Sequence, residues 1–590
     1  MKETLIDIET YSEVDIGKCG LYRYATDPSF EILLVAWATD EGEGFGETRC
    51  ADLASGEPLP KELLEDFQSG NVRLIAHNAS FERVCFSVHL QRHLPGQYLK
   101  PGEFLSPDSW ICTMVMAASL TLPMALKDVG AVLKTSQQKD KEGERLIKLF
   151  SMPCKPTKSN GMRTRNLPEH YPADWEKFKY YCIQDVNTEV DIYKRLKKFP
   201  MPVQEWKHYR VNERINDRGV KIDTELVQQA IACDLMLSDA MSKKAYELTG
   251  LENPNSVSQL KSWLDERGIP MDTLGKKDVA QMIDELDKNG VDAEAMDMLK
   301  LRLQMAKSSV KKYQAAERCV CSDGRARGLF QFYGASRTGR YSGRNIQLQN
   351  LPQNHISTLD EARELVKLGC FDMVETIYGN TPDVLSQLIR TMLIPKEGCE
   401  FIVADFSAIE ARVLAYLAGE TWRSKVFAEG KDIYCASASQ MFGVPVEKHG
   451  INGHLRQKGK IAELALGYGG SVGALKSMGA LEMRLTEEEL QPLVNSWRNA
   501  NPMITAFWWD IDRAVKTTIT QRIQTEVRGI RFFYKSGMLF IKLPSGRLLS
   551  YVKPRIGENQ YGGESVTYEG VGSTKKWERI ESYGPKFVEN

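Results

Sequence analysis

The chain has 590 residues, of which 42% are hydrophobic and 26% are charged, and its formal net charge is −1. This composition is typical of a soluble globular protein, and the length is too great for one core, so we expect several domains. No apolar run approaches the roughly 20 residues of a membrane-spanning helix, and the polar start MKETLIDIET excludes a signal peptide. Twelve scattered cysteines without a CxxC pair favour a reduced, cytoplasmic location.

The predicted elements change in character along the chain. Residues 1 to about 195 mix short β-rich runs with helical stretches, except that a polar, irregular stretch from about 140 to 175 is expected to be a loop. From Pro202 to about Cys319 the periodicity is helical. Short strands return after Gly328, a helical block spans roughly 420 to 525, and two strand-like runs follow. The fold class is therefore an α/β multidomain protein.

Carboxylates in the N-terminal third form the first candidate site. Asp7 and Glu9 lie two residues apart in a strand-like run, so both side chains point to one face of a sheet. Glu82 follows another strand, in the segment HNASFE. Tyr181 and Asp185 lie at i and i+4, on one face of a helix. A DxE pair alone is weak evidence for a catalytic site, so the prediction depends on all of these residues together.

In this order the segments resemble the DEDD exonucleases with a tyrosine in the third motif, the proofreading type fused to family A DNA polymerases. The resemblance implies an RNase H-like fold and two Mg²⁺ or Mn²⁺ ions that activate water and stabilise the leaving 3′-oxygen. Glu82 stands where the family usually has Asp, which moves the position of that ligand. The implied metal ligands are Asp7, Glu9, Glu82 and Asp185, and Tyr181 would orient the attacking water.

Two further segments resemble the palm of the same polymerases. In YGASRTGRYSGRNIQLQNLP, residues 333–352, the resemblance implies that Arg340 reads the minor groove at the primer terminus. The run FIVA is expected to be a strand, and DFSAIEAR after it is similar to polymerase motif A. There Asp405 would bind both catalytic metals, and Glu410 would close the space of a ribonucleotide 2′-hydroxyl. Alternatively, Glu410 is an ordinary acid at a helix start.

A basic helix is predicted in RQKGKIAELALGYGG. Arg456, Lys460 and Leu464 fall on one stripe, with Tyr468 one further turn on and a glycine pair ending the helix. The segment resembles the fingers helix RxxxKxxxFxxYG of family A, whose two cations suit a triphosphate. Leu464 stands where the family has Phe or Tyr, and Tyr434 stands in the place of a phosphate-contacting His. Taken alone, the pattern also fits a generic basic helix face.

The resemblance to family A covers nearly the whole chain. Within that family, the chain is similar to phage polymerases that lack a 5′-nuclease domain. The resemblance implies an enzyme of the cytoplasm (of the host cell, if the source is a phage) that uses dNTPs, primer–template DNA and two Mg²⁺ or Mn²⁺ ions per active site, with no membrane partner. The residues implied in DNA contact are Arg340, Gln349, Asn350 and Arg412. The implied domains are an exonuclease at 1–195, a thumb at 196–325, a first palm part at 326–420, fingers at 421–525 and a second palm part at 526–590.

One expected motif is missing from the sequence. The family completes its polymerase metal site with motif C, a His-Asp-Glu hairpin, and none of the eight histidines is followed by Asp. A two-metal transfer without one carboxylate anchor should lose most of its rate. We therefore expect a split polymerase, in which a small second polypeptide supplies motif C and the last palm elements. The alternatives are a truncated form, a stand-alone 3′→5′ exonuclease whose other two-thirds grip DNA, and a non-catalytic scaffold.

Overall fold

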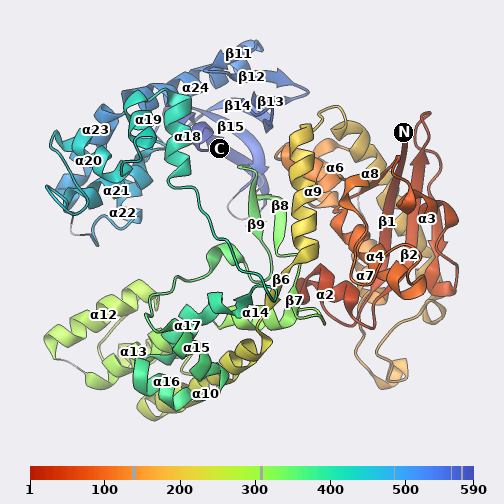
Figure 1. Ribbon diagram of the computed structural model, residues 1–590, viewed down its shortest axis with the longest axis horizontal. Coiled ribbons are helices and arrows are strands. Elements are labelled where there is room, and N and C mark those ends of the chain that lie inside the picture. Colours follow the sequence, from red (N-terminus) through yellow and green to blue (C-terminus); the bar gives the residue numbers. More distant parts are fainter. Residues whose placement is uncertain are drawn as a thin grey trace.

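The computed structural model describes residues 1–135, 141–290, 292–305, 310–335, 337–483, 485–559, 561–572 and 576–590. Figure 1 shows the N-terminal part as one body beside the helix α9 (Val203–Arg218), with a lower and an upper block on the other side of α9. Within these described ranges, no helix is both long enough and apolar enough to cross a bilayer.

A five-stranded mixed sheet forms the core of the N-terminal part, in the order β3-β2-β1-β4-β5. The central strand β1 (Lys2–Tyr11) pairs antiparallel with β2 (Glu31–Asp40) and parallel with β4 (Val72–Ala76). Successive side chains of β1 enter two different cores, because both faces of the sheet are covered. Ile6 and Ile8 join one core, and Leu5 joins the core that contains α8 (Pro172–Leu196). The odd-numbered side chains of β1 therefore face α8. The other elements here are α1 (Ile16–Cys19), α2 (Leu21–Thr26), β3 (Arg49–Asp52), α3 (Lys61–Gln68), α4 (Ser80–His93), β5 (Trp110–Cys112), α5 (Thr113–Ser119) and α6 (Leu126–Leu133).

The loop predicted between about residues 140 and 175 is wrong in part, because Lys141–Phe150 forms the helix α7. Leu146 and Phe150, four residues apart, are buried in the core that contains α8. The ring of Phe150 meets that of Trp175 on α8 with centroids 4.8 Å apart. The short segment looks polar in sequence, but its apolar residues lie on one face, and burial of that face stabilises the helix.

The lower block of Figure 1 is built around α10 (Thr224–Thr249). The segment 359–388, which was expected to be palm, folds as three helices in one hydrophobic core with α10 and α14. Leu226 of α10 and Leu385 share this core. Residues 359–388 therefore pack with the helical block rather than with the C-terminal sheet. The elements of this block are α11 (Val257–Glu266), α12 (Lys276–Asn289), α13 (Ala293–Met305), α14 (Lys311–Cys319), α15 (Leu359–Lys367), α16 (Phe371–Tyr378) and α17 (Thr381–Leu388), with a small sheet of β6 (Val220–Ile222), β7 (Arg325–Ala326) and β10 (Leu393–Ile394).

The upper block combines helices with a six-stranded antiparallel sheet in which consecutive strands are neighbours. Phe507 of α24 (Pro502–Gln521) shares a core with Phe532 of the sheet and with Leu466 of α21 (Leu455–Leu466). This shared core makes the fingers-like helices and the sheet one body. The remaining elements are the hairpin β8 (Phe330–Ala335) and β9 (Arg340–Gly343), the helices α18 (Ile409–Ala418), α19 (Thr421–Ala428), α20 (Ile433–Phe442), α22 (Val472–Ser477), α23 (Glu487–Ala500) and α25 (Gly584–Glu589), and the strands β11 (Thr525–Val527), β12 (Ile530–Lys535), β13 (Met538–Lys542), β14 (Leu548–Glu558), β15 (Glu564–Val571) and β16 (Trp577–Ser582).

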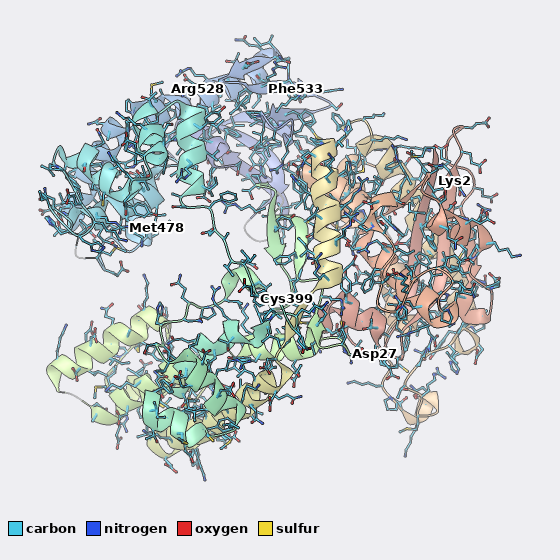
Figure 2. The ribbon with its side chains drawn as sticks, viewed as in Figure 1. Lys2, Asp27, Cys399, Met478, Arg528 and Phe533 are labelled. Carbon is cyan, nitrogen blue, oxygen red and sulfur yellow. The ribbon has the colours of Figure 1, made fainter. Side chains whose placement is uncertain are left out.

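The strand predicted at FIVA is wrong. Phe401–Ala404 has no regular structure and lies in the connection between the lower and upper blocks, close after Cys399 (Figure 2). Ile402 is 91% exposed and Val403 is 89% exposed. A strand needs a hydrogen-bonding neighbour, and no described strand pairs with this segment. The β-branched residues are present, but the described part of the chain offers no strand that pairs with them.

Candidate active sites

Three carboxylates meet at the α8 face of the N-terminal sheet. Asp7 and Glu9 are odd-numbered residues of β1, and Asp185 comes from α8. Ligand oxygens of these three side chains all lie within 4.8 Å of one another. Carboxylate oxygens at this spacing suit a hard divalent cation such as Mg²⁺ or Mn²⁺. The structure thus brings together three of the four metal ligands expected from the sequence.

Tyr181 lies one helical turn before Asp185 on the same face of α8, and the charge of the Asp185 carboxylate acts on its hydroxyl. Burial, with these acidic neighbours, raises the pKa of Tyr181 above its ordinary value, so the phenol keeps its proton. The tyrosine ring stacks on Phe178 with centroids 6.2 Å apart. Gly143 of α7 lies so close that a Cβ there would come 2.0 Å from a ring carbon of Tyr181. Helix α7 therefore fixes the position of this ring.

Glu82, the fourth expected ligand, is not in the group of three. It lies in the first turn of α4, is 3% exposed, and has one buried oxygen without a hydrogen-bond partner. Burial, followed by the charge of Asp7, holds the pKa of Glu82 well above its ordinary value of 4.5. An orphaned buried carboxylate oxygen near Asp7 is what a missing cation would leave, so the donor set fits the metal implied by the resemblance.

Another acid near this group, the buried Glu189, was missed in the sequence. It is 1% exposed, lies four residues after Asp185 on α8, and accepts a hydrogen bond from the Thr113 hydroxyl at 2.9 Å. Burial and the charge of Asp7 hold its pKa well above the ordinary value. The signal was present, because Tyr181, Asp185 and Glu189 are spaced by four and share one helix face.

The second site is a pocket of about 300 Å³ between α18, α20 and α21. Five residues predicted from the sequence line it, although they come from separate segments of the chain. They are Asp405, Glu410, Tyr434, Leu464 and Tyr468. Asp405 is exposed, and Ala408 begins the turn into α18 with a positive φ of 51°. In the described part of the chain, the only cluster of three or more potential metal ligands is the N-terminal one, so Asp405 is not part of such a cluster.

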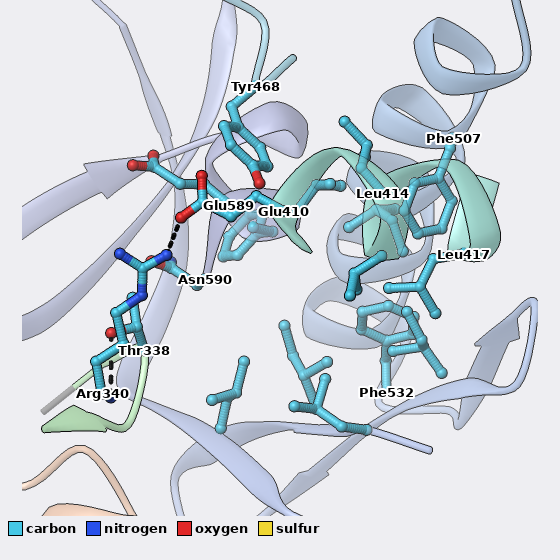
Figure 3. Close-up of a pocket in the computed structure, with 18 of the residues that line it drawn as sticks. Thr338, Arg340, Glu410, Leu414, Leu417, Tyr468, Phe507, Phe532, Glu589 and Asn590 are labelled. Carbon is cyan, nitrogen blue, oxygen red and sulfur yellow. Dashed lines mark hydrogen bonds and ion pairs between the residues drawn. The ribbon is translucent and has the colours of Figure 1, made fainter. Parts of the chain in front are cut away.

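Arg340 and Glu410 form an ion pair across the mouth of a neighbouring pocket of about 360 Å³. Figure 3 shows Arg340 reaching from the β8–β9 hairpin to Glu410, with Tyr468 close by. Burial raises the pKa of Tyr468 to about 12, and the Glu410 charge adds to this effect. The rest of the pocket is largely apolar and includes Phe532 and Phe587.

Helix α21 carries the predicted cations, but it ends earlier than expected. Its last residue is Leu466, so Tyr468 lies beyond the helix in the following turn. The reason is that the chain turns sharply at the glycines, where a Cβ on Gly470 would come 1.9 Å from the carbonyl oxygen of Ala465. Arg456 is held by Asp432 at 2.8 Å and lies over the Tyr434 ring, 5.2 Å from its centroid. Lys460 is partly buried on the same stripe.

The other residues expected to contact DNA lie near the hairpin or at the start of α18. Gln349 packs against Gly343, on the strand that carries Arg340. Asn350 donates to the Gln347 side chain at 3.5 Å. Arg412 donates to the carbonyl of Ser407 at 2.8 Å and lies 4.4 Å from the centroid of the Phe427 ring. Arg412 thus braces the turn after Asp405.

The chain belongs to DNA polymerase family A, whose sequence profile matches residues 229–533. It is a DNA-directed DNA polymerase and is 51% identical, over 592 residues, to the DNA polymerase of Bacillus phage SP02, covering 100% of this chain and 88% of that protein. The thermostable DNA polymerase I of Thermus thermophilus is 27% identical over 309 residues, covering 50% of this chain and 32% of that protein. The solved POL domain of Pol1 from M. smegmatis, in complex with DNA primer-template and dNTP, has the same fold, with a TM-score of 0.53 at 16% identity, covering 93% of this chain and 77% of that one.

Proposed function

We propose that this DNA polymerase also carries a proofreading 3′→5′ exonuclease in residues 1–195. The observation that carries the proposal is the convergence of Asp7, Glu9 and Asp185 beside a tyrosine hydroxyl. A five-stranded mixed sheet with helices on both faces is also consistent with the RNase H-like domain that the sequence resemblance implies. A primer 3′ end that is paired wrongly would be removed here before synthesis continues.

The residues of this site have separate roles in the proposed reaction. Asp7, Glu9 and Asp185, with Glu82 as the fourth acid, would hold two Mg²⁺ or Mn²⁺ ions. Such ions, when bound, lower the pKa of water and offset the charge of the leaving 3′-oxygen. The Tyr181 hydroxyl, one helical turn from Asp185, would hold the attacking water in line with the phosphate.

The exonuclease is tested with the Asp7→Ala/Glu9→Ala double variant on single-stranded DNA labelled at the 5′ end. We expect the release of nucleotides to fall by about 10²–10³-fold or more, because the site loses two of its carboxylates. The matched control is Glu41→Ala/Glu43→Ala, which removes two exposed acids, also two residues apart, from the same part of the chain. Full nuclease activity in the Asp7→Ala/Glu9→Ala protein would refute the metal assignment.

We also propose roles for the second site in nucleotidyl transfer. Asp405 would anchor the catalytic Mg²⁺ or Mn²⁺ ions, and Arg456 and Lys460 would bind the triphosphate of the incoming dNTP. Glu410 and Tyr468, which share the pocket with Asp405, would bound the sugar of that nucleotide. Leu464 and Tyr434 line the same pocket. Leu464 stands where the family has Phe or Tyr, so it would offer the base an aliphatic contact, and Tyr434 stands where the family has His. Arg340, Gln349, Asn350 and Arg412 would contact the primer–template.

Finally, we propose that a second polypeptide supplies the remaining carboxylates beside Asp405. Two observations support this part of the proposal. The apolar run Phe401–Ala404 is exposed beside Asp405, and an apolar pocket of about 360 Å³ lies close to Glu410. A β-hairpin bearing His-Asp-Glu would form strand hydrogen bonds with the run Phe401–Ala404 and would fill the apolar pocket near Glu410.

Primer extension separates the outcomes for the second polypeptide. The chain is assayed alone and with a small protein that carries a His-Asp-Glu hairpin and is encoded next to it. Extension that appears only with the added protein supports the split polymerase. Full-rate extension by the 590 residues alone would refute it. Exonuclease activity without extension under either condition would favour the stand-alone exonuclease.

A further inference from the structure

A buried ion pair lies under the proposed nucleotide pocket. Arg423 of α19 and Glu463 of α21 form two parallel hydrogen bonds, and the Arg423 Nη1 to Glu463 Oε1 distance is 2.8 Å. Their side chains are 1% and 4% exposed. Both line the pocket of about 300 Å³ that also contains Asp405. The roles proposed above for the second site do not use this pair.

The Glu463 carboxylate joins four helices. Besides Arg423, its Oε1 accepts hydrogen bonds from Ser437 of α20 at 2.8 Å and from the indole of Trp497 of α23 at 3.0 Å. Arg423 also donates to Asn501, the residue between α23 and α24, at 3.0 Å. A buried charge with this many directional partners permits one orientation of the helix that bears it.

The orientation of α21 decides which residues face the nucleotide. Glu463 points into the fingers core, whereas the next residue, Leu464, is 52% exposed in the pocket. Adjacent residues of an α-helix are about 100° apart around the axis, so holding Glu463 inward also holds Leu464 toward the pocket. Apolar burial is non-directional, so it selects the orientation of α21 less sharply than a buried charge with fixed hydrogen-bond partners does.

We propose that Glu463, clamped by Arg423, is a positioning residue of the nucleotide site, acting through the orientation of α21. This inference rests on the proposed role of α21 in dNTP binding. The predicted consequence is specific: loss of the clamp weakens dNTP binding while primer–template binding, which uses other elements, is kept.

The test measures binding, so it does not require turnover. The full chain is bound to a dideoxy-terminated primer–template, and the Kd of the complementary dNTP is measured with Mg²⁺. We expect Glu463→Gln, which keeps the shape and removes the charge, to raise this Kd about tenfold or more, with the Kd for primer–template changed less than about twofold. Ser437→Ala, a milder variant that removes one donor, should raise it about threefold.

Two controls give each outcome a meaning. Glu489→Gln neutralises a half-exposed carboxylate that pairs at 2.7 Å with Lys458 of α21, and should leave the dNTP Kd unchanged. Lys460→Ala tests the nucleotide site itself.

An unchanged dNTP Kd in Glu463→Gln and Ser437→Ala, with a raised Kd in Lys460→Ala, overturns this inference alone. An unchanged Kd in Lys460→Ala overturns the proposed site and the inference with it. Equal losses of dNTP binding, DNA binding and thermal stability would show a merely structural role and also overturn the inference.

Discussion

Arg340 and Glu410 form an ion pair although they lie on a hairpin and on a helix of different parts of the chain. Both side chains are exposed, at 66% and 54%, so the pair adds little to stability. We expect Glu410→Gln to change the free energy of unfolding by less than about 1 kcal/mol, measured by urea denaturation. Glu410→Ala removes the side chain that would fill the space of a 2′-hydroxyl, so this second variant should bind ribonucleotides more tightly. A large loss of stability, or unchanged discrimination against rNTPs, would contradict the proposed role.

Gly143→Ala tests whether α7 positions the tyrosine of the exonuclease site. Alanine is favoured over glycine in a helix by about 1 kcal/mol, but here its Cβ would collide with Tyr181. We expect exonuclease activity on single-stranded DNA to fall about tenfold or more, because small displacements at a reacting centre cost much rate. Gly70→Ala is the control, since a Cβ there would meet nothing within 4 Å. Equal activity in the two variants would argue against α7 as the element that holds Tyr181.

Glu189 predicts a dependence of stability on pH. Its folded pKa lies well above its ordinary value of 4.5, so the folded state holds the proton more tightly than the unfolded state. The stabilisation is complete below about pH 4.5 and is lost as pH rises through the folded pKa. Glu189→Gln resembles the neutral form and does not titrate. We expect this variant to gain stability relative to the natural protein as pH rises from about 4.5 to about 7.5, in chemical denaturation with EDTA present. A constant difference across this range would contradict the assignment.

Val403→Lys tests whether the segment before Asp405 is a docking strand. Val403 is 89% exposed, so the substitution should change the free energy of unfolding of this chain by less than about 0.5 kcal/mol. Primer extension in the presence of the second polypeptide should fall sharply, because a lysine would enter the new apolar interface. The control is Lys396→Ala, which changes an exposed position earlier in the same connection. Unchanged extension in Val403→Lys would argue against docking at this segment.

Short-range patterns were sufficient for much of the candidate chemistry. The alternation of β1 placed Asp7 and Glu9 on one face, and the spacing of four placed Tyr181 beside Asp185. Both follow from the period of one element and need no knowledge of its neighbours. The stripe of Arg456 and Lys460 on α21 was predictable for the same reason. The membership in family A, suggested by these motifs, is confirmed by the family profile and by the phage relative.

Tertiary structure decided what depends on partners distant in sequence. Glu82 is not part of the group of three acids, whereas Glu189 lies close enough for the charges of Asp7 and Asp185 to act on it. The packing of α4 and α8 on the sheet sets these positions. FIVA has strand-forming residues but no neighbouring strand among those described, and the Arg423–Glu463 clamp joins residues 40 positions apart on two helices. Local periodicity sets the direction of a side chain on its own element, whereas hydrogen-bond pairing, burial and charge partners arise only when separate elements pack together.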